Sequence, residues 1–229
     1  MSKEREVAID VADGLLAGTL ELPDHPRGVV VLAQETGSER LSQRHRDIAH
    51  RLREHGLGAL RIELLTDEEE QAERWTRHLR WDEEETEAQA RYLRLEVSVF
   101  TDRLLAVSQW VKRTLALDMA YFGASTAAAA ALSAAARGAD VAAVVSREGC
   151  PDLAAEALTS VRAPTLLLVD AEDGPTLERN RSALGALRGP ADLTVVPGGM
   201  QFCEEPSILD AVAELATRWY DQPRCTPWR

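Results

Sequence analysis

The chain lacks several features that would place it in other classes of protein. None of its apolar runs approaches the roughly 20 residues that span a bilayer, so we expect no membrane association. Its 26 lysines and arginines are outnumbered by 38 aspartates and glutamates, which gives a formal net charge of −12. Because nucleic acids bind basic faces, this excess of acid argues against nucleic acid as a partner.

Cysteine is also scarce, since the 229 residues hold only Cys150, Cys203 and Cys225. An odd number without a Cys-x-x-Cys pair favours free thiols and argues against a disulfide framework or a zinc site. The charged residues 1–6 do not resemble a signal peptide. We therefore expect a cytoplasmic protein with no bound metal and no cofactor.

Histidine is absent from the whole of the chain after residue 78. The five histidines are His25, His45, His50, His55 and His78. The segment 121–127, Tyr-Phe-Gly-Ala-Ser-Thr-Ala, lies between a strand-like and an alanine-rich helical pattern. A nucleophilic serine is displayed on a sharp turn in such a setting, which makes Ser125 the candidate. No downstream histidine is present to activate it.

Strand-like and helical patterns alternate along most of the chain. Short apolar runs, typical of strands buried on both faces, occur at 29–33, 57–65, 119–123, 141–146, 165–169 and 193–196. Helical patterns separate them at 41–55, 93–117, 126–136, 151–160 and 174–187, and a last one follows at 206–219. This alternation predicts one α/β domain over 1–229, a doubly wound, mostly parallel sheet with helices on both faces. Sites in such sheets lie at the carboxyl ends of the strands.

Two segments depart from this alternation. Residues 67–92 are strongly acidic and carry His78 between two tryptophans, and we interpret them as one or two exposed helices inserted over the sheet. The segment could be a solvated face, a docking surface for a basic partner, or a lid that brings His78 to the site as a substitute base. The C-terminal residues 222–229, with two prolines, are expected to form a loosely held tail.

Beyond the serine motif, several segments resemble the dienelactone-hydrolase-like branch of the α/β-hydrolase superfamily. They are 143–147 (Ala-Val-Val-Ser-Arg), 151–154 (Pro-Asp-Leu-Ala), 163–169 (Ala-Pro-Thr-Leu-Leu-Leu-Val), and Val-Pro-Gly at 196–198 with Glu-Glu-Pro at 204–206. The resemblance covers about residues 7–220. It implies a Ser–Asp–His triad, in which Ser125 matches the nucleophile, Asp173 the acid, and Gln201 the position of the histidine.

The chain departs from the pattern of this family at three loops. Gln201 cannot accept and return a proton as the histidine would. Gln34 and Glu35 occupy the oxyanion loop, where relatives commonly carry His-Gly, and a carboxylate there would repel a developing oxyanion. After Ser146, a Gly-Gly-Arg-like sequence is replaced by Glu-Gly-Cys at 148–150.

These residues define a candidate site at the carboxyl edge of the sheet. The candidate catalytic residues are Ser125, Asp173, Gln201 and Glu35, and the candidate binding residues are Gln34, Thr126, Glu148, Cys150 and Met200. If the carboxylates converge, at least one pKa should be raised, which suits a general acid or base. Equally, Ser125 could be an inherited serine that only lines a pocket.

Three functions remain open on the sequence. We favour a non-hydrolytic enzyme of lyase, cyclase or isomerase type that acts on a small molecule. The alternatives are a pseudoenzyme that binds a ligand or a protein, and a weak esterase or dienelactone-type hydrolase with an unrecognised base. A small-molecule ligand is expected, and a homodimer is left open.

Overall fold

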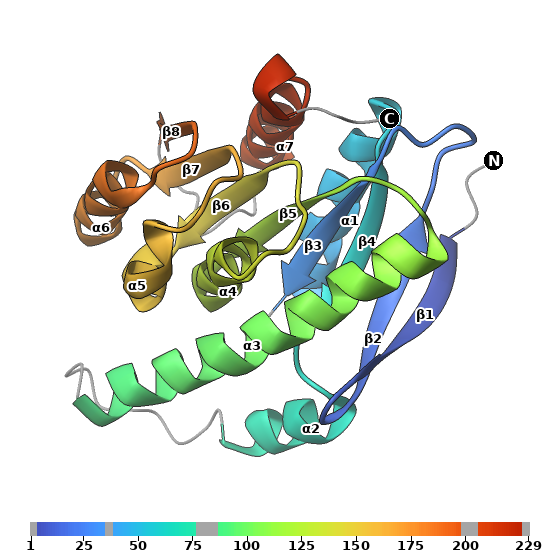
Figure 1. Cartoon of the computed structure of the whole chain (residues 1–229), viewed down its shortest axis with the longest axis horizontal. Coiled ribbons are helices and arrows are strands. Elements are labelled where there is room, and N and C mark those ends of the chain that lie inside the picture. Colours follow the sequence, from blue (N-terminus) through green and yellow to red (C-terminus); the bar gives the residue numbers. More distant parts are fainter. Residues whose placement is uncertain (1–3, 35–38, 77–86, 198–205, 226–229) are drawn as a thin grey trace.

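The computed structural model describes residues 4–34, 39–76, 87–197 and 206–225 of the chain (Figure 1). Within these ranges eight strands form one sheet in the order β1-β2-β4-β3-β5-β6-β7-β8. The strands are β1 (Glu4–Val11), β2 (Gly14–Glu21), β3 (Val29–Gln34), β4 (Gly58–Glu63), β5 (Met119–Ala124), β6 (Val144–Gly149), β7 (Thr165–Asp170) and β8 (Ala191–Val196). The β1–β2 and β2–β4 pairs are antiparallel and the other pairs are parallel, which confirms the predicted sheet.

Helices cover both faces of this sheet (Figure 1). They are α1 (Glu39–Glu54), α2 (Asp67–Thr76), α3 (Glu87–Thr114), α4 (Ser125–Ala136), α5 (Ala155–Leu158), α6 (Gly174–Ala186) and α7 (Pro206–Tyr220), with short 3-10 helices η1 (Pro151–Ala154) and η2 (Pro223–Cys225). Helices α3 and α4 contribute to the apolar core on one face, and α1 and α7 to the core on the other. This arrangement leaves the carboxyl ends of the parallel strands along one edge.

Helix α4 packs unusually closely on the sheet because both surfaces are built from small residues. The alanines at 127–131 have no exposed area, and the helix lies between the sheet and α3 (Figure 1). A Cβ atom added to Gly123 at the end of β5 would lie 2.9 Å from the backbone carbon and oxygen of Ala127 and from Cα of Ala128. Only glycine therefore fits at the point where the chain turns from β5 into α4.

The start of α2 is fixed by a buried arginine from α3. Arg103, only 2% exposed, donates to the carbonyl oxygen of Leu64 at 2.5 Å and pairs with the carboxylates of Asp13 and Glu69 at 2.5 and 2.7 Å. Glu69 also accepts from the backbone N–H of Thr66 at 2.9 Å, as in a capping box. The hydrogen bond from Arg103 is the main cause that lowers the pKa of Glu69.

Some sequence-predicted boundaries are wrong, for identifiable reasons. Strand β6 occupies 144–149 instead of 141–146, so Glu148 and Gly149 belong to the strand and not to the loop after it. Helix α3 begins at Glu87 instead of residue 93. Its first turns project beyond the body of the molecule (Figure 1). Apolar periodicity therefore begins only near Val97, the first residue of this helix in the core.

The predicted acidic insertion and C-terminal tail are only partly described. Residues 67–76 and 87–92 are helical, whereas His78 and its role as a lid residue lie outside the described residues. The expectation of a loose tail fails for Cys225, which has no exposed area and belongs to the same apolar core as Trp219 and Tyr220. The 3-10 turn η2 returns the chain to α7 and so buries this thiol.

The close contact between β5 and α4 predicts opposite effects for two glycine substitutions. Gly123→Ala should destabilise the fold by about 1–3 kcal/mol, because its Cβ would meet backbone atoms that cannot rotate away. Gly185→Ala in α6, where an added Cβ meets nothing within 4 Å, should stabilise by about 0.5–1 kcal/mol. Urea unfolding of both variants and the wild type measures the two free energies. Equal effects would show that the elbow is not tightly packed.

Candidate active site

Ser125 lies at the tip of the turn between β5 and α4, as the sequence predicts. Its backbone has φ of 49°, in the left-handed region that few non-glycine residues adopt. The preceding Ala124 is the N-cap of α4 and makes no side-chain hydrogen bond to it. The first-turn N–H groups therefore receive no cap from that residue, and a helix N-terminus of this kind favours negative charge.

The end of β6 lies directly beside Ser125. Ser125 and Gly149 form a parallel bridge, and the N–H of Cys150 donates to the carbonyl oxygen of Ser125 at 3.3 Å. A Cβ at Gly149 would lie 2.1 Å from Oγ of the fully buried Ser146 and 3.0 Å from Cβ of Ala128, so a larger residue there would force Ser146 to move. The residues on either side of this glycine, Glu148 and Cys150, carry side chains at this end of β6.

Glu148 lies in a strained and partly desolvated position. Its φ of 48° is left-handed, which costs roughly 1–2 kcal/mol for a residue that has a Cβ. The half-buried carboxylate accepts a 2.5 Å hydrogen bond from the N–H of Asp170 at the end of β7. Its side chain is thus directed from β6 toward the neighbouring strand.

Burial is the main cause that raises the pKa of Glu148. The negative charges of Asp173 and Asp170 also raise this pKa. The hydrogen bond from the Asp170 N–H and the positive charge of Arg147 lower it. The sequence predicts a raised pKa from clustered carboxylates, whereas burial is the larger cause here and the charges of Asp173 and Asp170 add less. Glu148 is therefore suited to hold a proton closer to neutral pH than an ordinary glutamate.

Asp173 follows β7 and is the N-cap of α6. Its carboxylate accepts from the backbone N–H of Thr176 at 3.0 Å, which fixes the side chain at the start of the helix. The buried Asn180 of α6 donates to the carbonyl oxygens of Gly149 at 3.1 Å and Thr176 at 2.9 Å. This amide therefore ties the start of α6 to the end of β6, beside Glu148. No sequence signal distinguishes Asn180 from an ordinary helical asparagine.

The other predicted site residues divide into described and undescribed positions. Gln34 ends β3 and is 6% exposed, and Thr126 is buried in the first turn of α4. Within the described residues, Oγ1 of Thr126 has no hydrogen-bond partner. Cys150 is half-buried and is the N-cap of η1. Glu35, Met200 and Gln201 lie outside the described residues, so their places in the site stay predictions.

Three further observations complete the description of the site and its surroundings. His45 is 3% exposed and meets the ring of Phe122 edge-on at a centroid distance of 6.5 Å. In the part of the chain that the structure describes, no three His, Cys, Asp or Glu side chains are placed to hold a metal ion. Over the same residues, no helix has an apolar stretch long enough to cross a bilayer.

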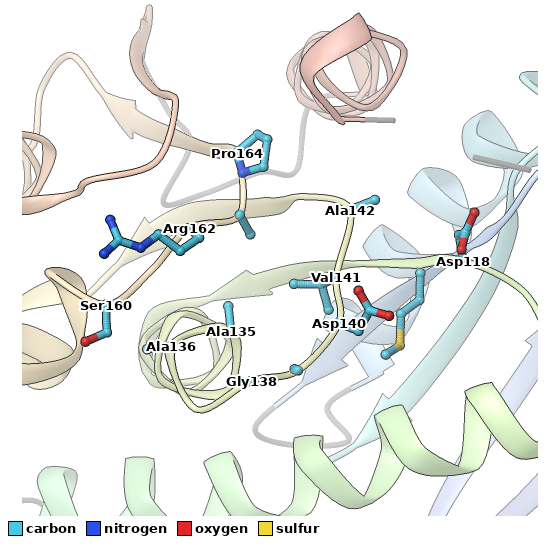
Figure 2. Close-up of a pocket in the computed structure, with 13 residues that line it drawn as sticks. Asp118, Ala135, Ala136, Gly138, Asp140, Val141, Ala142, Ser160, Arg162 and Pro164 are labelled. Atoms are coloured by element: carbon cyan, nitrogen blue, oxygen red, sulfur yellow. The ribbon is translucent and has the colours of Figure 1, made fainter. Parts of the chain in front are cut away.

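A cavity of about 790 Å³ lies at the opposite edge of the sheet, where β5, β6 and β7 begin (Figure 2). Its lining includes Asp118 before β5, Asp140 before β6 and Arg162 before β7. None of the residues predicted from the strand ends lines it. The rule that sites lie at the carboxyl ends of parallel strands therefore does not predict this cavity.

A solved structure decides the relationship of the chain to known proteins. Dienelactone hydrolase from Anabaena variabilis is 40% identical, with a TM-score of 0.82 over 96% of this chain and 97% of that one. The chain belongs to the dienelactone hydrolase family. Est1E from Butyrivibrio proteoclasticus, 12% identical with a TM-score of 0.70 over 95% of this chain and 99% of that one, shares the α/β-hydrolase fold.

Longer relatives also carry this dienelactone hydrolase-like unit. Two Mycobacterium tuberculosis proteins (strains CDC 1551 and H37Rv), both named "Putative phosphoribosyl transferase", are 40% identical over 229 residues. The match covers 98% of this chain and 48% of theirs, so the chain spans about half the length of the curated relatives it matches. No protein-family model matches the chain.

The raised pKa of Glu148 predicts a specific pH dependence of stability. A carboxyl whose folded pKa exceeds its unfolded value of 4.5 stabilises the fold most below that value, and this stabilisation is lost as the pH rises through the folded pKa. Relative to Glu148→Gln, the wild type should therefore lose free energy of unfolding from pH 4 upward and then level off. Urea unfolding at half-unit pH steps measures the difference.

The matched control for this titration is Glu156→Gln, because Glu156 is an exposed carboxylate on the nearby α5. That variant should keep a free energy of unfolding within about 0.5 kcal/mol of the wild type, as surface substitutions usually do. A pH-independent difference for Glu148→Gln would show that the Glu148 carboxylate is as well solvated in the fold as in the unfolded chain.

Proposed function

We propose that this protein is a small-molecule enzyme in which Glu148 transfers a proton and Ser125 forms no covalent intermediate. The reaction is of isomerase, lyase or cyclase type, as opposed to the ester hydrolysis of a Ser–His–Asp triad. The observation that carries the proposal is the state of Glu148. It is a partly desolvated carboxylate, on a left-handed backbone, at the edge where Ser125 and Asp173 also lie.

The position of Glu148 across the sheet supports a role in proton transfer. β6 lies between β5, which ends at Ser125, and β7, which precedes Asp173. The base of a serine triad must stand between its nucleophile and its acid. Glu148 belongs to β6, so in the order of the strands its carboxylate lies between Ser125 and Asp173. Backbone strain held at such a place points to a function that offsets its cost.

The sequence supports the second half of the proposal, the loss of acyl chemistry. Gln201 matches the histidine of the family triad, and Glu35 lies in the oxyanion loop. A serine hydroxyl without a base is a poor nucleophile, and a carboxylate near a developing oxyanion opposes its formation. Proton transfer next to a carbonyl needs neither the serine nor the histidine, because one carboxylate can remove the proton and return it. The enolate oxygen that forms in between needs hydrogen-bond donors, and we assign that role to the N–H groups at the start of α4, which Ala124 does not cap.

The family name gives the substrate class to test, an unsaturated cyclic ester. α-Angelica lactone is a suitable probe, because movement of one proton gives the conjugated isomer and addition of water gives levulinic acid. Proton NMR distinguishes the two products in one sample. Wild-type protein should isomerise the lactone, and Glu148→Gln should be slower by about 10²–10⁴-fold, the usual worth of a positioned general base.

Ser125→Ala is the matched variant for this assay, since it removes the hydroxyl and leaves the carboxylate. It should retain isomerisation within a few-fold of the wild-type rate. Hydrolysis to levulinic acid that disappears in Ser125→Ala would contradict the proposal and identify a serine hydrolase with an unrecognised base.

The nucleophilicity of Ser125 can be measured without a substrate. A fluorophosphonate probe at neutral pH should leave Ser125 unmodified, because within the described residues no side chain hydrogen-bonds to its hydroxyl as the base of a serine nucleophile would. Intact mass spectrometry reads the extent of labelling, and a conventional serine hydrolase in the same tube verifies that the probe is active. Stoichiometric modification of Ser125 would require an activating base and would overturn the non-covalent mechanism.

A binding module is the second candidate function, and one observation favours it. The M. tuberculosis relatives carry this unit as about half of a longer chain that bears the name of a different enzyme. We propose that in this case the unit binds a ligand or a protein and catalyses nothing. The lactone assay separates the candidates, because a binding module gives the buffer rate in wild type and in both variants.

A further inference from the structure

The cavity at the amino edge of the sheet is remote from the proposed active site. It lies where three connections meet, from α3 to β5, from α4 to β6 and from α5 to β7 (Figure 2). Its volume of about 790 Å³ is within the range of small-molecule sites. Ser125 and Glu148 lie at the other ends of β5 and β6, so a ligand here would not meet them.

The middle of the cavity is apolar, and the backbone near it is already paired. Ala135, Val141, Ala142 and Pro164 line it between its charged ends (Figure 2). The N–H of Ala142 donates to the carbonyl oxygen of Met119 at 2.7 Å, and the carbonyl oxygen of Pro164 accepts from Val144 at 2.8 Å. These two backbone groups are therefore not free to bind a ligand, and the charged side chains are the groups to consider.

The charged side chains lie at opposite ends. Arg162 extends along one side of the cavity, and Asp118 and Asp140 lie at the other (Figure 2). Within the described residues, no ion pair or side-chain hydrogen bond engages the guanidinium of Arg162. Such a group can take a carboxylate in bidentate fashion. One end of the cavity is therefore suited to an anion.

The other end suits a cation for two reasons. Asp118 and Asp140 place two carboxylates there, and α4 ends nearby with Ala135 and Ala136 in the lining. The C-terminus of a helix carries partial negative charge, which adds to the effect of the carboxylates. Lys112 pairs with Asp140 at 3.4 Å, but both side chains are mostly exposed, so this pair contributes little and can be displaced.

We propose that this cavity binds a zwitterion with an aliphatic middle, such as an ω-amino acid. Its carboxylate pairs with Arg162, its ammonium group faces Asp118 and Asp140, and its methylene chain covers the apolar middle. The opposite charges at the two ends distinguish such a ligand from a simple anion or a simple amine. The site is separate from the proton-transfer site and does not depend on its chemistry.

Binding of a length series tests the proposal. 4-Aminobutanoate, 6-aminohexanoate and 8-aminooctanoate are titrated into the full chain and followed by amide NMR shifts. At least one should bind with a dissociation constant on the order of 1 mM, as expected for so small a ligand. Hexanoate and hexylamine each lack one charge and should bind about tenfold more weakly or not at all.

Substitutions at both ends locate the ligand. Arg162→Met should weaken binding of the best amino acid about tenfold and leave the binding of hexylamine unchanged. The double variant Asp118→Asn, Asp140→Asn should also weaken binding of the best amino acid about tenfold, and it should leave the binding of hexanoate unchanged. Arg181→Met, an exposed arginine of α6 outside the cavity, is the matched control and should bind as the wild type does. The exposed position of Arg162 makes misfolding of its variant unexpected, and urea unfolding verifies this.

Two results would overturn the assignment. One is that no amino acid of the series binds more tightly than its single-charge analogues. The other is that Arg162→Met binds the best amino acid as tightly as Arg181→Met does. Neither result bears on Glu148, so the proposed function would stand or fall separately.

Discussion

The short distance between β5 and α4 determines where the side chains at the carboxyl edge of the sheet lie. Gly123 and the alanines of α4 allow the helix to begin at once after the strand, and this sharp turn puts Ser125 in a left-handed conformation at the tip. The bridge between Ser125 and Gly149 then fixes where the end of β6 lies relative to the end of β5. Glu148 follows from that position, and its bond to Asp170 fixes it against β7. A single close contact thus determines the geometry of three strand ends, those of β5, β6 and β7.

Polar contacts connect this edge to the rest of the fold at a few points. Asn180 holds the start of α6 to the end of β6, and Arg103 holds the start of α2 to α3 and to the β1–β2 turn. Both side chains are almost fully buried. The two carboxylates that pair with Arg103 are partly exposed, so these pairs avoid the full desolvation cost of a buried ion pair. Arg103 can therefore hold the two segments together although solvent reaches its partners.

Much of the fold was predictable, because alternating apolar and helical patterns reflect burial directly. The boundaries failed where burial did not leave that pattern, as in the projecting turns of α3 and the buried Cys225 near the C-terminus. Ser125 was recognisable because a glycine-flanked turn has a local signature. The strained, partly desolvated state of Glu148 was not, because it arises between β6 and β7, and the bond partner Asp170 is distant in sequence. The cavity around Arg162 had no signature, since three separate connections build it.

The left-handed backbone at Glu148 also has a consequence for mutational drift. Glutamate and glycine codons differ by one nucleotide, and glycine is the residue that this conformation accommodates without strain. A relaxing substitution is therefore always one step away. A chain under pressure for stability alone would be expected to take that step, because removal of local strain is among the simplest routes to a more stable fold. Under the proton-transfer function proposed above, the glutamate at this position exchanges stability for the chemistry of a carboxyl group.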